Sequence, residues 1–399
     1  MSTTASQGPL SGVRVLDLTN VILGPFATQT LAELGADVIK VEPPEGDGMR
    51  YAGPMRNSGM GPLFLHANRG KRSIVLDLKQ RDDHGLFLEL VGQADVFITN
   101  MRPAALQRLE IDYERLREHR ADLIYALCSG FSTEGPLAGR PAYDDLIQGA
   151  SGLAHLIATY NDDAPAFVPL TLSDRITGLH AVYAVTAALY HRSLTGQGQK
   201  VEIPMYDVMA QLVLADHLGG RSFEPALDQG GYARLLTRNR KPYPTLDGHI
   251  CAVIYQDKHW RSFFEAIQAP PEVTQDARFC SHAERIRHSD HVYGYVADVM
   301  KTRSTQAWQR ILDDADIPNV PMQTLDGLCA DPQLVANGML TRQQHPTEGE
   351  IYALGSPVRW SGSRPGPVRA APALGEHSAE IRDALQQSRG AQNRRQDPE

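Results

Sequence analysis

Residues 13–44 read VRVLDLTNVILGPFATQTLAELGADVIKVEPP, and this stretch decides the fold. The apolar run over 13–18 predicts a short buried strand. A Gly-Pro pair then opens a helix over 24–34, and residues 37–42 form a second strand that two prolines end. A strand, a helix and a strand in this order predict two parallel strands joined by a right-handed crossover.

The same alternation continues toward the middle of the chain. We expect strands over 73–78, 95–100 and 123–128, with helices over 83–91 and 104–109 between them. The pattern predicts an α/β fold whose large domain has an open, parallel, Rossmann-like sheet with helices on both faces. Ligands of such sheets bind beyond the carboxyl ends of the strands, so the loops that follow the strands form the candidate site.

The domain organisation follows from a change of pattern near residue 225, where a basic segment with few apolar residues leads into a strand and several helices. We expect residues 1–224 to be the first part of the large domain and 225–325 to be a smaller α+β domain. Residues 326–386 are expected to return and complete the large domain. The polar residues 387–399 are expected to form a disordered tail.

Composition excludes several classes of protein. The chain has 399 residues with a net charge of −8 and no large basic block, so nucleic acid is not an expected partner. Its cysteines are widely spaced without a C-x-x-C pair, which is typical of reduced thiols and predicts a cytoplasmic location. No apolar run approaches the length of a membrane span, and the first residues lack the features of a signal peptide, so neither is expected.

Several common motifs are also absent. No G-x-G-x-x-G follows the first strand, and the chain contains no Walker loop and no G-x-S-x-G elbow. These absences argue against a dinucleotide-binding enzyme, a P-loop enzyme and an α/β-hydrolase. The cluster of Cys280, His282, His288 and His291 matches no zinc template, so no metal site is expected.

Asp174 lies in the run PLTLSDRITG, residues 169–178, just before a small-residue segment over 178–190 that predicts a buried helix. An aspartate at a helix start is most often a cap that accepts from free backbone N–H groups. The alternative is a carboxylate held at the positive end of a rigid helix and usable as a nucleophile. Both interpretations remain open from this segment alone.

Basic residues gather near the ends of the expected strands. They are Arg69, Lys71, Arg72, Arg102 and Arg108. Guanidinium and ammonium groups pair well with phosphate oxygens, so this distribution suits a phosphorylated ligand.

Eight short segments, in order along nearly the whole chain, resemble the family III CoA-transferases (CaiB/BaiF type), the group that includes formyl-CoA transferase and carnitine CoA-transferase. These segments are residues 10–19 with Gly24-Pro25, residues 34–42, 68–74, 100–103, 143–148, 173–178, 195–199 and 374–377.

The resemblance implies an enzyme whose nucleophile is the aspartate of a D-x-x-x-G segment, which is Asp174 with Gly178 here. The enzyme would move CoA from an acyl-CoA to a free carboxylic acid through aspartyl mixed-anhydride and aspartyl-CoA thioester intermediates. Coenzyme A and acyl-CoA are then substrates, and no metal or prosthetic group is bound. The resemblance also implies a CoA-binding large domain and an interlocked homodimer.

The resemblance further implies the residues that bind the substrate and CoA. These are Val21, Ile22 and Leu23 on the loop of the CoA channel, Lys71 and Arg72 near the nucleotide phosphates, Asn100, Met101, Arg102 and Arg108 on a strand end and helix that contact CoA, and the active-site tyrosine Tyr143. Ile22 replaces a glutamine that contacts the acyl group in formyl-CoA transferase, which weighs against formyl or oxalyl specificity. Residues 238–245 replace that enzyme's glycine-rich loop, so we expect a differently built acyl pocket.

Two other functions are compatible with these segments. The racemase branch of the same superfamily has an aspartate at this position and a histidine shortly before the Tyr-Asp pair, whereas residues 139–144 here read GRPAYD without histidine. A non-catalytic CoA-binding protein is the second alternative. For the transferase, Arg234, Arg238 and Arg240 suggest that the substrate is a dicarboxylic acid, because they offer partners for a distal carboxylate.

Overall fold

The computed structural model describes residues 8–363 and 368–396, and the chain divides into two compact units. The second unit consists of Gly152–Phe167 and Leu212–Pro332, and the first unit contains the rest. The boundaries therefore differ from the expected 225–325. The later divisions fall inside the helices α9 (Met205–His217) and α17 (Pro332–Ala336), and a continuous helix gives no compositional sign of a boundary.

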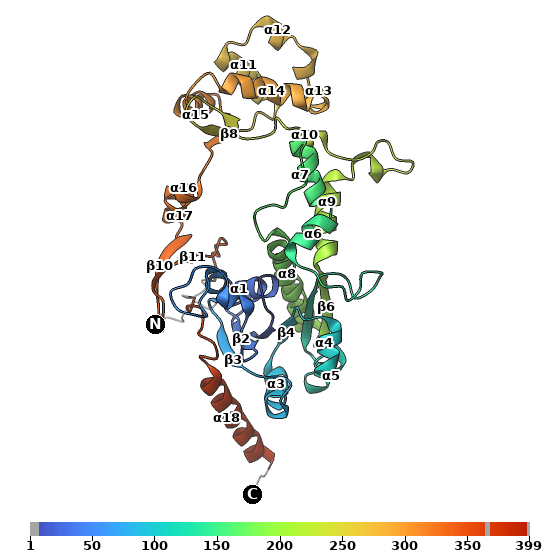
Figure 1. Cartoon of the computed structure of the whole chain (residues 1–399), viewed down its shortest axis with the longest axis vertical. Helices are drawn as coiled ribbons and strands as arrows, with labels where there is room; N and C mark the ends of the chain where they lie inside the picture. Colours follow the sequence, from blue (N-terminus) through green and yellow to red (C-terminus); the bar gives the residue numbers. More distant parts are fainter. Residues whose placement is uncertain (1–7, 364–367, 397–399) are drawn as a thin grey trace. The chain divides into compact units, whose positions relative to one another are not determined.

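The first unit contains a six-stranded sheet with the order β3-β2-β1-β4-β5-β6, and every pairing is parallel. Figure 1 labels β2, β3, β4 and β6 of this sheet. The strands are β1 (Arg14–Leu18), β2 (Asp37–Glu42), β3 (Arg72–Val75), β4 (Val96–Thr99), β5 (Ile124–Ser129) and β6 (Gln199–Pro204). The expected open α/β sheet is confirmed. The order reverses between β1 and β4, and such a point opens a crevice at the carboxyl ends of the strands.

Helices cover both faces of this sheet. They are α1 (Leu23–Glu33), α3 (Arg81–Gln93), α4 (Pro103–Arg108), α5 (Tyr113–His119), α8 (Leu172–Thr195) and α18 (Ser378–Gln396), while α2 (Pro62–Asn68) packs on α1 and α6 (Asp144–Ala150) packs on α8. Alternate residues of a strand face opposite sides. Leu16, Ile39 and Phe97 therefore pack in a core with residues of α3, α5 and α18. Asp17 and Lys40 occupy the intervening positions, on the side of α1 and α8.

The second unit has a core of its own. A three-stranded antiparallel sheet with the order β7-β8-β9 packs with helices around Trp260, Phe263 and Trp308. Its elements are α7 (Leu153–Asn161), α10 (Ala233–Leu236), β7 (Tyr243–Pro244), β8 (His249–Ala252), α11 (Asp257–Ile267), α12 (Pro271–Thr274), α13 (His282–Arg287), α14 (Ser289–Met300), α15 (Thr305–Asp314), β9 (Asn319–Pro321) and α16 (Leu325–Cys329).

The C-terminal part returns to the first unit. It forms the antiparallel hairpin of β10 (Leu340–His345) and β11 (Gly349–Leu354), and then α18. Ile381 and Leu385 of α18 are buried against the sheet core. α18 continues to Gln396, through most of the segment for which a disordered tail from residue 387 is expected. Residues 397–399 of the expected tail lie outside the described residues.

Candidate active site

A cavity of about 380 Å³ opens at the carboxyl edge of the sheet, beside the point where the strand order reverses. Its wall is made by Asn20, Val21, Leu23, Asn100, Met101, Arg102, Pro103, Ala105, Cys128, Ser129, Gly130, Phe131, Thr133, Gly139, Arg140, Pro141, Ala142, Tyr143, Asp174 and Met205. The loops after β1, β4 and β5 thus meet the start of α8, as the parallel topology predicts.

Asp174 lies in the first turn of α8 and is only 8% exposed. Its backbone N–H donates to the Asp144 carboxylate over 2.9 Å. Asp144 therefore caps the helix, and the Asp174 side chain does not. Among the described residues, no group donates a hydrogen bond to the Asp174 carboxylate. The structure thus leaves this carboxylate free at the wall of the cavity, at the positive end of a helix.

Asp144 is itself fixed by its neighbours. The Gln148 amide, one turn along α6, donates to the Asp144 carboxylate over 2.6 Å. The same Gln148 side chain accepts from the Val168 N–H over 2.9 Å and donates to the Leu170 carbonyl over 3.3 Å, so it also holds the segment that leads into α8. These contacts place a second carboxylate close to Asp174 and keep it there.

The electrostatic surroundings raise the pKa of Asp174 to about 7. Burial is the main cause, and the neighbouring negative charge of Asp144 adds to it, while Arg175 opposes both. A carboxylate without a hydrogen-bond donor and with few water contacts is poorly stabilised as an anion. The Asp174 carboxylate is therefore more basic than an ordinary aspartate, which makes it a candidate functional group.

Gly178 sets the distance between α8 and α1, the helix that follows the β1 loop. A β-carbon at this position would lie 2.8 Å from Phe26 Cδ1 and 3.0 Å from the Leu23 carbonyl oxygen. Only glycine allows this approach without displacing α1. The Arg175 guanidinium also lies 5.1 Å from the centre of the Phe26 ring. The glycine of the D-x-x-x-G segment thus brings the start of α8 to the β1 loop.

The predicted site residues fall into two groups. Those that the structure brings together at the cavity are Asp174, Val21, Leu23, Asn100, Met101, Arg102 and Tyr143, of which Tyr143 is 67% exposed. Those that do not line it are Ile22, Lys71, Arg72 and Arg108. Ile22 is 2% exposed and packs in the interior, and Arg108 lies exposed at the end of α4.

The expected role of Lys71 at the nucleotide phosphates is not compatible with its position. Its side chain is fully buried, and its ammonium group donates to Asp17 over 2.9 Å, to the Pro25 carbonyl over 3.0 Å and to Asn68 over 2.7 Å. All three donors are used. The Lys71 side chain therefore connects β1, α1 and α2 and has no donor left for a phosphate.

Arg72 also pairs with protein carboxylates. Its guanidinium bonds Asp37 over 2.7 Å and Glu380 over 3.0 Å, which ties β3 to β2 and α18. Both corrections have one cause. The run from Arg69 to Arg72 looks like a basic surface cluster in sequence, but its acidic partners come from distant segments.

The three arginines expected to meet a distal carboxylate belong to the second unit, and two of them have side-chain partners there. Arg238 pairs with Asp162 over 3.2 Å, and Arg234 donates to the Tyr293 hydroxyl over 2.8 Å. By contrast Arg140, which was not predicted as a site residue, lies on the cavity wall.

A second cavity of about 360 Å³ adjoins the carboxyl ends of β2 and β3. It shares Asn20 and Met101 with the first cavity and is also lined by Asp47 and Lys79. The two cavities therefore meet at the β1 loop.

Neither Asp47 nor Asp144 was predicted from the sequence as a site residue, because each carboxylate acts by accepting hydrogen bonds from backbone groups of other segments. The one local sign was the Asp144–Gln148 spacing, which puts both side chains on one helix face.

Within residues 8–363 and 368–396, no group of three or more His, Cys, Asp or Glu side chains could hold a metal ion. None of the helices in the same ranges is long and apolar enough to cross a membrane.

Known proteins match the chain over most of its length. The sequence profile of CoA-transferase family III matches residues 10–378. A succinyl-CoA:mesaconate CoA-transferase from Haloarcula hispanica is 33% identical over 94% of this chain and 96% of that protein. The human succinyl-CoA:glutarate CoA-transferase is 29% identical over 94% of this chain and 85% of its own. The crystal structure of a CAIB/BAIF family protein from Brucella suis aligns with a TM-score of 0.80 and 30% identity, covering 96% of this chain and 100% of that one. The protein therefore belongs to CoA-transferase family III.

Proposed function

We propose that this CoA-transferase works by covalent catalysis at Asp174. The Asp174 carboxylate attacks the acyl-CoA thioester carbonyl, the C–S bond breaks, and a mixed anhydride and CoA thiolate result. The thiolate then attacks the aspartyl carbonyl of the anhydride, which gives aspartyl-CoA thioester and releases the donor carboxylate. The observation that carries this proposal is the free, buried Asp174 carboxylate on the cavity wall, with its pKa raised to about 7.

The second half of the reaction reverses these steps with another acid. The acceptor carboxylate attacks the aspartyl-CoA thioester, forming a second mixed anhydride and CoA thiolate. The thiolate attacks the acceptor's carbonyl, which yields the new acyl-CoA and restores Asp174. No net proton is taken up or released. Water has to be kept from the anhydrides, and the burial of Asp174 supports this requirement.

We infer that the CoA moiety lies across the two adjoining cavities. The thioester would meet Asp174 in the first cavity, past Val21, Leu23 and Met101. The nucleotide part would extend over the second, where Lys79 is the exposed cation on the wall. This assignment replaces the expected contacts from Lys71 and Arg72.

We further propose that the acceptor is a dicarboxylic acid. The relatives named above act on mesaconate and glutarate. In this chain Arg102 and Arg140 line the cavity that holds Asp174, and within the described residues neither guanidinium is paired with a carboxylate. An unpaired guanidinium on a cavity wall suits a distal carboxylate.

The test of this substrate class compares acceptors. Arg140→Gln and Arg102→Gln should raise KM for dicarboxylic acceptors about tenfold while leaving KM for monocarboxylic acceptors within about twofold. Arg238→Gln, in the second unit, is the matched control and should change neither. If both variants instead raised KM equally for every acyl-CoA and every acid, the result would indicate that these arginines contact the CoA phosphates.

A second copy of the chain is the proposed partner. Leu179, Tyr183, Tyr190 and Leu194 are spaced to lie along one side of α8, and each is more than half exposed in the single chain. We propose that they are covered in a homodimer. Sedimentation at micromolar concentration should give a dimer that the double variant Tyr183→Glu/Tyr190→Glu dissociates, and a wild-type monomer would contradict the proposal.

The direct test of the function incubates the protein with a panel of acyl-CoAs and free acids and follows CoA exchange by mass spectrometry. Exchange in wild type and its absence in Asp174→Asn support the proposal. Deuterium incorporation from heavy water at the acyl α-carbon, without exchange, would identify a racemase-like enzyme. No histidine is among the residues that line the cavity, which disfavours that alternative. Tight acyl-CoA binding without either reaction would identify a binding protein.

A further inference from the structure

The turn Thr19-Asn20-Val21, which joins β1 to α1, lies between the two cavities. Val21 has a φ of +67°. This left-handed conformation is a genuine outlier for a β-branched residue, and it persists only where surrounding contacts hold it. The side chains that hold this turn in the strained conformation are therefore candidates for a functional role.

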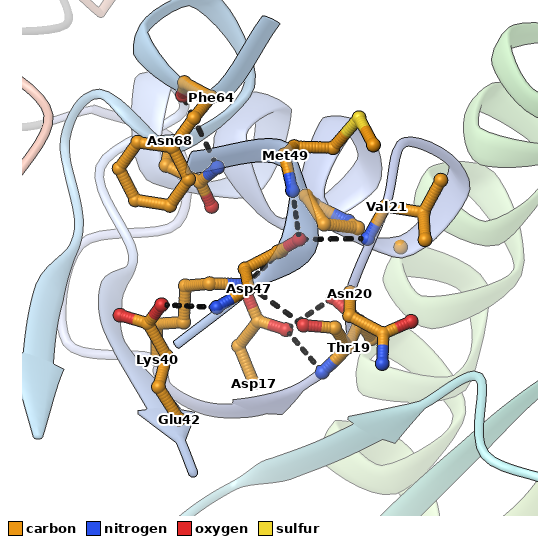
Figure 2. A network of polar contacts seen from close by, with 12 residues as sticks. Asp17, Thr19, Asn20, Val21, Lys40, Glu42, Asp47, Met49, Phe64 and Asn68 are labelled. Atoms are coloured by element: carbon orange, nitrogen blue, oxygen red, sulfur yellow. Dashed lines mark hydrogen bonds and ion pairs between the residues drawn. The ribbon is translucent and has the colours of Figure 1, made fainter. Parts of the chain in front are cut away.

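A buried ion pair holds the two ends of the turn. The Lys40 ammonium and the Asp47 carboxylate lie 3.0 Å apart with side chains 0% and 1% exposed. Lys40 donates to the Thr19 carbonyl over 2.7 Å, and Asp47 accepts from the Val21 N–H over 3.2 Å. Figure 2 shows the Asp47 carboxylate between Lys40 and the backbone nitrogens of Val21 and Met49.

A side-chain amide holds the middle of the turn. Asn100, at the end of β4, accepts from the Asn20 N–H over 3.1 Å and donates to the Asn20 carbonyl over 2.8 Å. Its oxygen and its nitrogen are both engaged with this one residue. Side chains from β2, from the loop after β2 and from the loop after β4 thus converge on three consecutive backbone units.

We propose that Lys40, Asp47 and Asn100 are positioning residues, and that they clamp the β1–α1 turn so that Val21 closes the wall of the cavity beside Asp174. This inference rests on the proposed covalent mechanism at Asp174. The clamp aligns the thioester with the Asp174 carboxylate and keeps water from the aspartyl anhydride. A buried ion pair adds little net stability compared with well-packed apolar residues. The convergence of three such groups on a strained turn in the reaction cavity therefore favours a positioning role over a purely stabilising one.

The test removes the side-chain contacts of two clamp residues with the variants Asp47→Ala and Asn100→Ala. Asp95→Ala is the matched control. The Asp95 carboxylate also accepts a backbone N–H, from Arg14 over 2.7 Å, and pairs with Arg120 and Arg192, but it precedes β4 at the opposite edge of the sheet and lines neither cavity. Three quantities are measured: kcat of CoA transfer, the ratio of acyl-CoA hydrolysis to transfer, and hydrogen exchange of the backbone around residues 19–21.

Both clamp variants should lower kcat about tenfold to a hundredfold, which equals about 1.4–2.7 kcal/mol of barrier. They should raise the hydrolysis-to-transfer ratio at least about fivefold and speed exchange at the turn. Asp95→Ala should lower the melting temperature but change none of the three. Asp47→Asn keeps an oxygen for the Val21 N–H and should recover most of kcat.

The inference would be overturned if folded Asn100→Ala kept the wild-type kcat, hydrolysis-to-transfer ratio and hydrogen-exchange rates. It would also be overturned if Asp95→Ala changed these three quantities as much as the clamp variants do. If Asp47→Ala does not fold, Asn100→Ala decides, because its side chain is partly exposed. The hydrogen-exchange measurement does not depend on enzymatic activity. If wild type transfers no CoA, the proposed function fails, while exchange at the turn still reports on the clamp.

Discussion

Asp17 and Asp174 are both buried aspartates, at 0% and 8% exposure, but their surroundings differ. Asp17 accepts from Thr19 and Thr28 and pairs with Lys71 over 2.9 Å. Burial alone would raise its pKa, but Lys71 and Lys40 outweigh burial and lower the pKa of Asp17. Asp174 receives no hydrogen bond from the described residues, and burial together with Asp144 raises the pKa of Asp174 to about 7.

We infer that this difference separates a structural carboxylate, Asp17, from the proposed reactive one, Asp174. A buried anion with a full set of donors and a cation is stable and has no free lone pair to offer a carbonyl carbon. A buried anion beside another carboxylate is poorly stabilised and remains available. Burial is common to both, so the partners decide the role.

The largest expected effect sharpens this comparison at Asp174. Asp174→Asn should lower the rate of CoA transfer about 10⁴-fold or more, or about 5 kcal/mol of barrier, because the amide cannot form the anhydride. Steady-state assays of the folded variant measure the loss. Asp82→Asn, which makes the same charge change in the first turn of α3, should leave the rate within about twofold. Retained transfer in folded Asp174→Asn would return this residue to a structural role.

The next largest effect is on stability and concerns Asp17, the carboxylate that pairs with Lys71. Lys71→Met should lower the free energy of unfolding by about 3–5 kcal/mol, because it leaves the buried Asp17 without its closest cation. Lys301→Met is the control, since Lys301 pairs with Asp298 at a similar 2.8 Å but on the exposed surface, and it should lose less than about 1 kcal/mol. Denaturant titration measures both. A higher KM for acyl-CoA with unchanged stability would instead show that Lys71 contacts the substrate.

The same Asp174→Asn variant should be more stable than wild type at pH 8. Because the pKa of Asp174 is raised from 3.8 to about 7 on folding, the folded state binds more protons than the unfolded state between those values. Wild-type stability therefore falls as pH rises through this window, and the neutral amide avoids the loss. We expect a gain on the order of 2–4 kcal/mol at pH 8 and a smaller gain at pH 5. A loss of about 1 kcal/mol at both pH values, as for a removed helix cap, would contradict the assignment.

The smallest effect is the pH dependence of the reaction itself. In the proposed mechanism the nucleophile is the ionised carboxylate, so kcat/KM should rise with pH to a plateau above an apparent pKa near 7, the pKa of Asp174. One unit below that value the rate should fall to about a tenth of the plateau. A pH series of initial rates measures this, and a flat profile between pH 5 and 8 would show that Asp174 is ionised throughout.

The fold could be predicted to a large extent from the sequence. The alternation of apolar strands with helices from residue 13 onward gave the parallel sheet, because periodicity and turn residues are local signals. The division into units was less accurate, because its later boundaries fall inside α9 and α17. The expected tail was helical as far as Gln396, since burial of Ile381 and Leu385 outweighs a polar composition.

The candidate site was predicted in part. The resemblance named Asp174 and residues of the loops after β1 and β4, and the structure places them on one cavity wall, while their roles in catalysis and binding stay predictions. Lys71 was misassigned because its partner Asp17 lies 54 residues earlier, and no local pattern reveals such a pair. Asp47, Asp144 and Arg140 were missed for the same reason, since each meets its neighbours only through tertiary structure.

Covalent capture at Asp174 tests the central claim most directly. Wild-type protein is incubated with an acyl-CoA and hydroxylamine and then mapped by peptide mass spectrometry, with protein lacking acyl-CoA as the control. The account predicts a hydroxamate on Asp174 that forms only with acyl-CoA and not in Asp174→Asn, because hydroxylamine cleaves the aspartyl-CoA thioester. CoA transfer that proceeds while Asp174 stays unlabelled, or a label on a different residue, would contradict it.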